Sequence, residues 1–293
     1  MLETLYKSMR HPNNNLKKLV STVATFYKTE SRDHLPWRPA SRKDSQDKTP
    51  NPYHILVSEM MLQQTQVDRV IPKYTAFIKT FPTVETLAAA PLSNVLLLWS
   101  GLGYNRRAKY LHDAAKVICS QYNKKFPKNA AELEKLPGVG PYTARAISTF
   151  AYNQPEVFIE TNIRTVFTHF CFAEHTQKVS DAEILPLVAR ALKESKVEPR
   201  DFYAALMDYG SHLKRSGVRI NNKSKHYTKQ SKFEGSVRQL RGAILRELLQ
   251  SPKTVSKLQK LTGRTLDEVQ NELRKLQKEK LLDKKGSRFV IKK

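Results

Sequence analysis

Cysteine is nearly absent from this chain of 293 residues, which contains only Cys119 and Cys171, far apart in the sequence. Two distant thiols exclude a disulfide framework and a metal site made of four cysteines. Long apolar runs are missing as well, because the longest, VLLLW at 95–99, is far too short to span a bilayer. The first ten residues, MLETLYKSMR, lack the apolar core of a signal peptide. We therefore expect a cytoplasmic protein with no membrane partner.

Acidic residues are scarce, with 27 Asp and Glu against 51 Lys and Arg, so the net charge is +24. The excess is concentrated in residues 211–293, which carry 23 basic and 7 acidic residues and a net charge of +16. A chain this basic attracts polyanions, and nucleic acid is the first expectation. A well-solvated surface is the alternative for an isolated cluster, but a whole segment at +16 favours a surface that faces phosphates.

Strand patterns are absent before the C-terminus, and helical periodicity dominates. Apolar residues recur at three- and four-residue spacing in four segments: 15–28, 66–81, 107–122 and 181–195. Residues 38–52 are polar and flanked by prolines, which predicts a surface loop. Residues 221–236 are basic and weakly apolar, which predicts a linker. The expected fold class is therefore mainly α.

A compact unit is expected after the linker, in residues 237–293. Three helices are predicted there, at 237–250, 254–263 and 265–280, and Thr265 and Glu268 have the spacing of a capping box. The last residues, 281–293, predict a short hairpin that turns at Lys285–Gly286. Three helices and a small basic hairpin describe a winged helix, in which the third helix commonly enters a DNA groove. A protein-contact module of the same shape is the alternative, and the basic charge favours DNA.

The stretch LPGVGPYTA (136–144) is the strongest local signal for a site. Gly138 and Gly140 stand two apart between helical segments and predict a tight hairpin whose backbone N–H groups face outward. Without Cβ atoms at these positions a phosphate can come close, and the N-terminus of the following helix favours its negative charge. The stretch resembles the helix-hairpin-helix of DNA repair glycosylases.

Four further blocks surround this hairpin in the order that one such family requires: LPWR (35–38), PYHILVSEMMLQQTQVDRVIPKY (52–74), LWSGLGYNRRAKYLHDAAK (98–116) and VFIETNIRTV (157–166). From residue 16 to 213 the chain resembles an adenine DNA glycosylase of the MutY kind. The resemblance implies a two-lobed helix-hairpin-helix DNA glycosylase fold that binds DNA in its cleft. The implied organisation is a glycosylase domain (1–220) with lobes at 53–165 and at 1–30 plus 166–220, a basic linker (221–236) and the winged helix (237–293).

Glu59 is the only acid in the stretch SEMMLQQTQV (58–67), and its neighbours are apolar. On this stretch alone it could be a solvated helix charge. The resemblance implies instead that Glu59 protonates the flipped-out adenine and makes the base a leaving group. That role requires an acid that keeps its proton near neutral pH, and desolvation by Met60, Met61 and Leu62 would raise its pKa.

A second carboxylate is expected near the anomeric carbon, because breaking an N-glycosidic bond leaves a sugar that resembles an oxocarbenium ion. The family places an Asp there, in the pattern D-G-N-V, and this chain has Glu160 in ETNI. The extra methylene moves the carboxylate by roughly an ångström, which can cost about 100-fold where geometry matters. We expect Glu160 to stabilise the sugar from a slightly remodelled backbone. A weakened or redirected enzyme is the alternative.

Tyr142 stands where relatives that also cleave the DNA strand carry a lysine that forms a Schiff base. A phenol cannot form an imine, so the resemblance implies a monofunctional glycosylase in which Tyr142 lines the catalytic pocket. Plain packing is the alternative for this side chain. Trp37, Arg38 and Asn162 match residues of the base pocket. The residues expected to contact DNA are Leu62, Gln63, Gln64, Tyr104, Gly138, Val139, Gly140 and Thr143.

The resemblance fails at three places, and one of them is Ala204, which stands where the family often has an acid or amide that faces the adenine. Relatives hold an iron–sulfur cluster with four cysteines, and the matching positions here are Lys214, Asn221, Ser224 and Gln230, none of which binds iron as a thiolate does. We therefore expect no cofactor and no metal. The 83 residues after position 210 are also too few for a linker and the family's 8-oxoguanine-recognition domain.

The sequence thus predicts a monofunctional DNA N-glycosylase of base excision repair. It would hydrolyse the N-glycosidic bond of adenine mispaired with 8-oxoguanine or guanine. Its partner would be double-stranded DNA with a mismatched or damaged base pair, and we expect a monomer that associates with the nucleoid through DNA. Two alternatives stay open: a glycosylase for thymine or uracil opposite guanine, and a non-catalytic DNA-binding protein on the same scaffold.

Overall fold

The computed structural model describes residues 12–38, 50–228, 230 and 232–292. These residues form two units by their contacts. The first unit comprises the described residues within 1–50 and 144–229, and the second those within 51–143 and 230–293. Most of the loop expected at 38–52 lies outside the described residues. The lobe, linker and domain boundaries inferred from the sequence remain a prediction.

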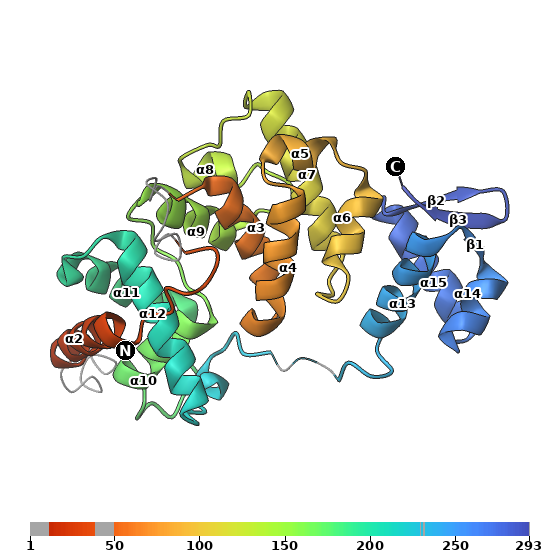
Figure 1. The fold of residues 1–293 in the computed structure, drawn as a ribbon. Helices are drawn as coiled ribbons and strands as arrows, with labels where there is room; N and C mark the ends of the chain where they lie inside the picture. The colour runs from red at the N-terminus through yellow and green to blue at the C-terminus, as the bar shows by residue number, and fades with distance from the viewer. Residues whose placement is uncertain (1–11, 39–49, 229, 231, 293) are drawn as a thin grey trace. The chain divides into compact units, whose positions relative to one another are not determined.

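The first unit is a cluster of helices around α10 (Figure 1). Its helices are α2 (Pro12–Glu30), most of α9 (Pro141–Tyr152), α10 (Thr161–Cys171), α11 (Asp181–Ser195), α12 (Pro199–Arg215) and the short 3-10 helix η2 (Asn221–Lys223). α10 packs against α12, α2, α11 and η2. A capping box at Ser180 and Glu183 fixes the start of α11 at the residue that the periodicity predicts. This packing buries α10 and so provides a fixed base for the residues at its N-terminus.

The second unit contains α3 and the helices that cover it (Figure 1). Its first part holds α3 (Pro52–Leu62), α4 (Val67–Thr80), α5 (Val84–Ala89), α6 (Leu92–Trp99), α7 (Arg106–Gln121) and α8 (Ala130–Leu133). The side chain of Asn51 caps α3 by accepting a hydrogen bond from Tyr53 N, and Pro52 suits the first helical position. α3 contacts both α4 and α7. α7 in turn contacts α5 and α6, so it connects α3 to these two helices.

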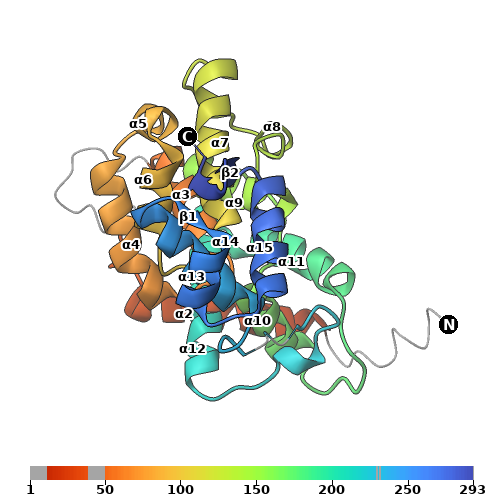
Figure 2. The ribbon, with the colours of Figure 1, turned by 90° about the vertical axis from the view of Figure 1, so that its right-hand side faces the viewer.

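The C-terminal part of the second unit is a winged helix, which confirms the expected architecture (Figure 2). It contains α13 (Val237–Gln250), α14 (Val255–Thr262), α15 (Leu266–Lys278) and a three-stranded antiparallel sheet in the order β1-β3-β2. The strands are β1 (Lys253–Thr254), β2 (Leu282–Lys285) and β3 (Arg288–Ile291). The capping box of Thr265 and Glu268 is present at the start of α15.

Two details of the winged helix differ from the expectation. Lys285 pairs with Arg288, so the hairpin turns at Gly286 and Ser287, one residue later than predicted. Gly286 takes the positive φ of +58° that the turn needs. The strand β1 was not predicted, because two residues are too few to show an alternating pattern. No helix among the described residues has the length and apolar character that crossing a membrane requires.

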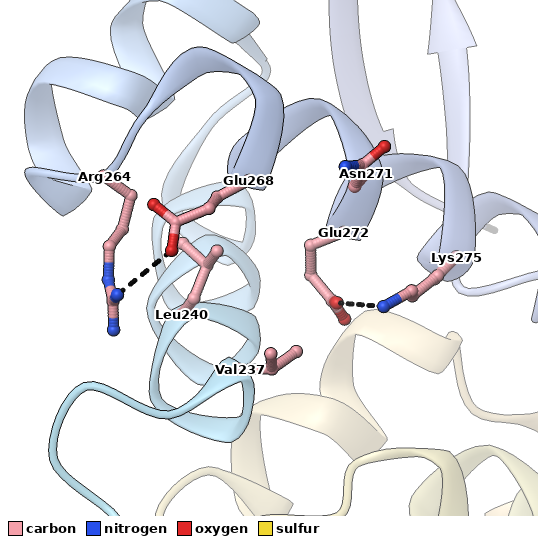
Figure 3. A pocket seen from close by; sticks show the side chains of 7 residues that line it. All are labelled: Val237, Leu240, Arg264, Glu268, Asn271, Glu272 and Lys275. Carbon is pink, nitrogen blue, oxygen red and sulfur yellow. Dashed lines mark hydrogen bonds and ion pairs between the residues drawn. The ribbon is translucent and has the colours of Figure 1, made fainter.

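A cavity of about 160 Å³ lies between α13 and α15 in the winged helix (Figure 3). Its lining residues are Val237, Leu240, Arg264, Glu268, Asn271, Glu272 and Lys275. Glu272 is buried, and its oxygens lie 3.3 Å from Arg241 Nη1 and 3.9 Å from Lys275 Nζ. Burial raises the pKa of Glu272, and the charge of Arg241 partly offsets this. None of the expected site residues lines this cavity.

Candidate active site

Glu59 lies on α3 and is only 9% exposed. Its neighbours Ser58, Met60 and Met61 are buried as well, so the helix presents no solvated face at this point. The carboxyl group is therefore not an ordinary surface charge, which is what the alternative interpretation of the stretch required.

The C-terminal end of α3 is held by the guanidinium of Arg107, a side chain that the sequence did not single out. Nη1 donates to Met60 O (2.8 Å), Met61 O (3.0 Å) and Gln63 O, while Nη2 donates to Thr65 Oγ1 (3.0 Å) and Gly103 O (3.2 Å). Burial lowers the pKa of Arg107 to about 10, so it still carries its charge at neutral pH. One buried cation thus fixes three carbonyls after Glu59 together with the loop at Gly103.

The turn after α3 and the loop before α7 each place one expected DNA contact in a left-handed backbone conformation. Gln64 has φ +55° and is exposed, and Tyr104 has φ +48° and is half-buried. The Arg107 guanidinium also lies 5.4 Å from the centre of the Tyr104 ring. Such conformations are unfavourable for side chains other than glycine and are kept only where the surroundings impose them. The backbone at both residues is therefore held in a defined conformation.

Tyr104 also contacts the start of the winged helix within the second unit. Arg238 Nη1 donates to the Tyr104 hydroxyl at 3.1 Å, and its guanidinium lies 5.7 Å from the ring centre. The Gln230 amide donates to the same hydroxyl. Sequence reasoning missed these contacts, since more than a hundred residues separate the partners.

The expected hairpin is present between α8 and α9, within the second unit. Gly138 has φ +76°, and a Cβ built on it would lie 2.5 Å from Tyr110 Cβ, so only glycine fits. Gly140 has open space around it, and Val139 between them is buried. Gln63 Nε2 donates to the buried Thr143 hydroxyl at 3.2 Å, which ties the end of α3 to the first turn of α9. The hairpin and the segment that carries Glu59 thus form one connected structure.

Glu160 is the N-cap of α10 in the first unit. Its Oε1 accepts hydrogen bonds from Asn162 N (2.6 Å) and Ile163 N (2.9 Å), and its Oε2 accepts one from Asn162 Nδ2 (3.2 Å). Asn162 Oδ1 in turn accepts from Lys214 Nζ at 2.7 Å. The longer side chain of Glu, compared with the expected Asp, is folded back onto the first turn of its own helix. Glu160 and Asn162 are thus brought together. Lys214 is a further partner, which the sequence indicated only as a position that matches a ligand of the iron–sulfur cluster.

Arg38 is tied to a buried acid of the first unit. Its Nη1 and Nη2 donate to the two carboxylate oxygens of Asp208 at 2.8 and 2.7 Å, and Arg32 Nε donates to Oδ1 at 2.5 Å. Asp208 itself is 1% exposed. Two guanidinium groups on one buried carboxylate form a strong, geometrically fixed cluster. Trp37, the neighbour of Arg38, is half-buried.

The positions that match the iron–sulfur ligands do not form a metal site. Asn221 Oδ1 accepts from Thr165 Oγ1 at 2.7 Å, and Ser224 Oγ accepts from His226 N at 3.0 Å. Cys119 and Cys171 are both free thiols and lie in different units. Among the described residues, no group of three or more His, Cys, Asp and Glu side chains could hold a metal ion. The residues present therefore do not fit an iron–sulfur cluster, which needs thiolates.

The chain has relatives among known proteins. Residues 57–189 match the family described as HhH-GPD superfamily base excision DNA repair protein. An adenine DNA glycosylase of Mycolicibacterium smegmatis is 41% identical over 179 residues, covering 60% of each chain. The adenine DNA glycosylase of Homo sapiens is 34% identical over 193 residues, covering 65% of this chain and 35% of the human protein. The chain thus spans only part of the length of these relatives.

Solved structures agree with the fold. The structure of a thermostable thymine-DNA glycosylase matches with a TM-score of 0.55 and 27% identity, covering 69% of this chain and 88% of that one. A trapped endonuclease III–DNA covalent intermediate matches with a TM-score of 0.52 and 18% identity, covering 75% and 90%. The fold is therefore that of helix-hairpin-helix glycosylases.

Residues 57–189 are thus similar to the HhH-GPD superfamily of base excision DNA repair proteins. The relatives at 34–42% identity are adenine DNA glycosylases, and the chain is similar to them over part of their length. The resemblance stated from the sequence motifs is thereby confirmed.

Proposed function

We propose that this protein is a monofunctional DNA N-glycosylase of base excision repair that removes adenine mispaired with 8-oxoguanine or guanine. The observation that carries the proposal is the buried carboxyl group of Glu59, on a helix whose end is locked to the hairpin through Gln63 and Thr143. A desolvated acid beside a hairpin suited to phosphates is what protonation of a flipped-out base requires. The names of the relatives at 34–42% identity support adenine as that base.

In the proposed reaction, Glu59 gives its proton to the adenine ring and the N-glycosidic bond breaks. The sugar gains positive charge as the base leaves, and the Glu160 carboxylate stabilises that charge until water adds to the anomeric carbon and its proton restores the acid form of Glu59. Three hydrogen bonds from Asn162 and Ile163 fix the place of this carboxylate. Such preorganised negative charge is effective because it need not reorient during the reaction.

Tyr142 supports the monofunctional character of the proposed enzyme. It stands in the first turn of α9, where a strand-cleaving relative would need an amine. A phenol can donate or accept a hydrogen bond but cannot form an imine with the abasic sugar. The proposed reaction accordingly ends with hydrolysis and uses no cofactor.

The proposal includes a second DNA contact, made by the hairpin of the winged helix. Lys285 and Arg288 face each other across β2 and β3, on the sheet face opposite the buried Leu282 and Phe289. Like charges in such a pair are destabilising, and among the described residues no carboxylate forms an ion pair with either. A DNA phosphate at each of the two side chains would relieve this repulsion.

The first turn of α15 is less suited to phosphates than the hairpin. It carries the exposed acids Asp267 and Glu268, which repel an approaching DNA backbone. We therefore assign the phosphate contact to the hairpin rather than to the start of the third helix.

A glycosylase for thymine or uracil opposite guanine is the second candidate. It is favoured by the fold match to a thymine-DNA glycosylase structure at 27% identity. A non-catalytic DNA-binding protein is a third possibility, and the buried carboxyl group of Glu59 argues against it, because a scaffold without chemistry would gain from an apolar residue there.

The test is a single-turnover base-release assay with enzyme in excess. The duplexes carry adenine opposite 8-oxoguanine, guanine or cytosine, and thymine or uracil opposite guanine. We expect release of adenine, and Glu59→Gln should slow it by about 10²–10⁴-fold while duplex binding persists. Release of thymine or uracil instead would transfer the protein to the second candidate. Binding without any base release would exclude both.

A further inference from the structure

α12 approaches the first turn of α10 so closely that residue 210 must be glycine. A Cβ built on Gly210 would lie 2.5 Å from Asn162 O and 2.7 Å from Asn162 Cβ. Lys214 follows Gly210 by four residues, so both lie on the same face of α12. The glycine therefore sets the spacing of the two helices, and the lysine reaches Asn162 from the next turn.

The side-chain amide of Asn162 connects Lys214 to Glu160 by one hydrogen bond on each side. A lysine ammonium only donates hydrogen bonds and a carboxylate only accepts them, so the Asn162 amide must turn its oxygen to Lys214 and its nitrogen to Glu160. The positive charge also polarises the amide and strengthens the bond that its N–H makes. Lys214 is half-buried, and burial lowers its pKa although the Glu160 charge raises it in part.

We propose that Lys214 is a positioning residue for Glu160, which it holds through Asn162 at the place where the sugar gains charge. The proposal rests on the proposed function, since it takes Glu160 as the carboxylate that faces the sugar. It also gives Lys214 a task at a position where the resemblance to cluster-containing relatives would require a thiolate.

Residues 221–223 also contact α10 and the residues after it, but at points away from Glu160. Asn221 holds Thr165 in the middle of α10, and Lys223 Nζ donates to the backbone oxygens of Ala173 and His175 beyond its end. Lys223 therefore holds the residues that follow α10, which lie far along the chain from Glu160. It is a matched control, because its removal changes the charge by the same amount.

The first experiment compares Lys214→Met with Lys223→Met in single-turnover release of adenine opposite 8-oxoguanine. We expect Lys214→Met to slow the chemical step by about 10–100-fold, because the carboxylate is displaced, and to bind the duplex as Lys223→Met does. Lys214→Arg should restore much of the rate, since a guanidinium can donate to the same oxygen. Equal loss of rate in the two methionine variants would overturn the proposal.

A double-mutant cycle tests the route through Asn162. If Lys214 acts through this amide, Asn162→Ala should slow base release, and adding Lys214→Met to it should have little further effect. Independent, multiplying losses would mean that Lys214 acts in another way. Trapping of a covalent DNA complex by borohydride through Lys214 would likewise contradict a positioning role, because it would make the lysine a nucleophile.

A measurement without catalysis separates this proposal from the proposed function. The amides of Asn162 and Ile163 donate to Glu160, so hydrogen exchange at residues 161–165 reports whether the carboxylate stays in place. Exchange there should quicken in Lys214→Met and stay unchanged in Lys223→Met. If the wild-type protein released no base, the proposed function would fail, and this exchange result would still decide the role of Lys214.

Discussion

The guanidinium of Arg107 joins the end of α3, the turn at Thr65 and the loop at Gly103 through five hydrogen bonds. A planar fork of donors is needed to reach acceptors on three sides, and the ammonium of lysine cannot replace it. Its importance for a reaction would come from what these segments carry, namely Glu59, Gln64 and Tyr104.

We predict that Arg107→Lys lowers the free energy of unfolding by about 2–3 kcal/mol, because buried carbonyls lose charged donors. Base release should slow by roughly 10–100-fold through misplacement of the two turns. Urea unfolding and single-turnover release measure the two effects. Arg106→Lys is the control, since Arg106 is exposed and lies over the Tyr110 ring. An equally mild result in both variants would show that the bonds of Arg107 are dispensable.

Single residues differ in how far the sequence reveals them. An acid among apolar residues, such as Glu59, can be recognised from the sequence alone. Arg107 cannot be recognised in this way, because its acceptors are mostly backbone carbonyls, which leave no pattern in the sequence. Lys214 and Asp208 were missed for a related reason, as their partners lie 52 and up to 176 residues away along the chain. Such roles depend on tertiary packing that periodicity does not encode.

Helices were more predictable than the short elements. The ranges 237–250 and 181–195 are helices with the expected bounds, because amphipathic spacing and caps both act within one segment. The 3-10 helix η2 appears inside the stretch expected to be a linker, where its bonds to α10 decide the local structure. Elements formed by packing were therefore the ones that were missed.

The hairpin between α8 and α9 offers a test in which two glycines separate stability from binding. Gly138→Ala should lower the free energy of unfolding by about 1–2 kcal/mol or more, since it forces a positive φ on alanine and a contact with Tyr110. Gly140→Ala should leave stability unchanged or raise it slightly, because its site is open and its φ is not positive. Its methyl group should still weaken duplex binding if a phosphate approaches there. Thermal unfolding and fluorescence anisotropy with labelled duplex check both, and loss of stability in Gly140→Ala alone would contradict this assignment.

At the scale of the whole molecule, the charge is large and unevenly distributed. A net charge of +24 attracts DNA to many parts of the surface, so weaker binding after removal of any lysine proves little by itself. The informative quantity is the salt dependence of the affinity. Its slope counts the phosphates that the protein neutralises, whereas a general change in charge has a smaller effect on it.

The winged-helix hairpin can be tested by this slope. We predict that Lys285→Ala with Arg288→Ala lowers the slope of log K against log salt by about 1.8, the value for two lost phosphate contacts, and weakens binding of undamaged duplex. Lys257→Ala with Lys260→Ala removes the same charge from exposed positions of α14 and should leave the slope unchanged. Titrations at several salt concentrations measure both variants. Asp267→Asn adds a third arm, because it would tighten binding only if the first turn of α15 faced the DNA. Tighter binding in that variant, or equal slopes in the two double variants, would place the DNA elsewhere on this domain.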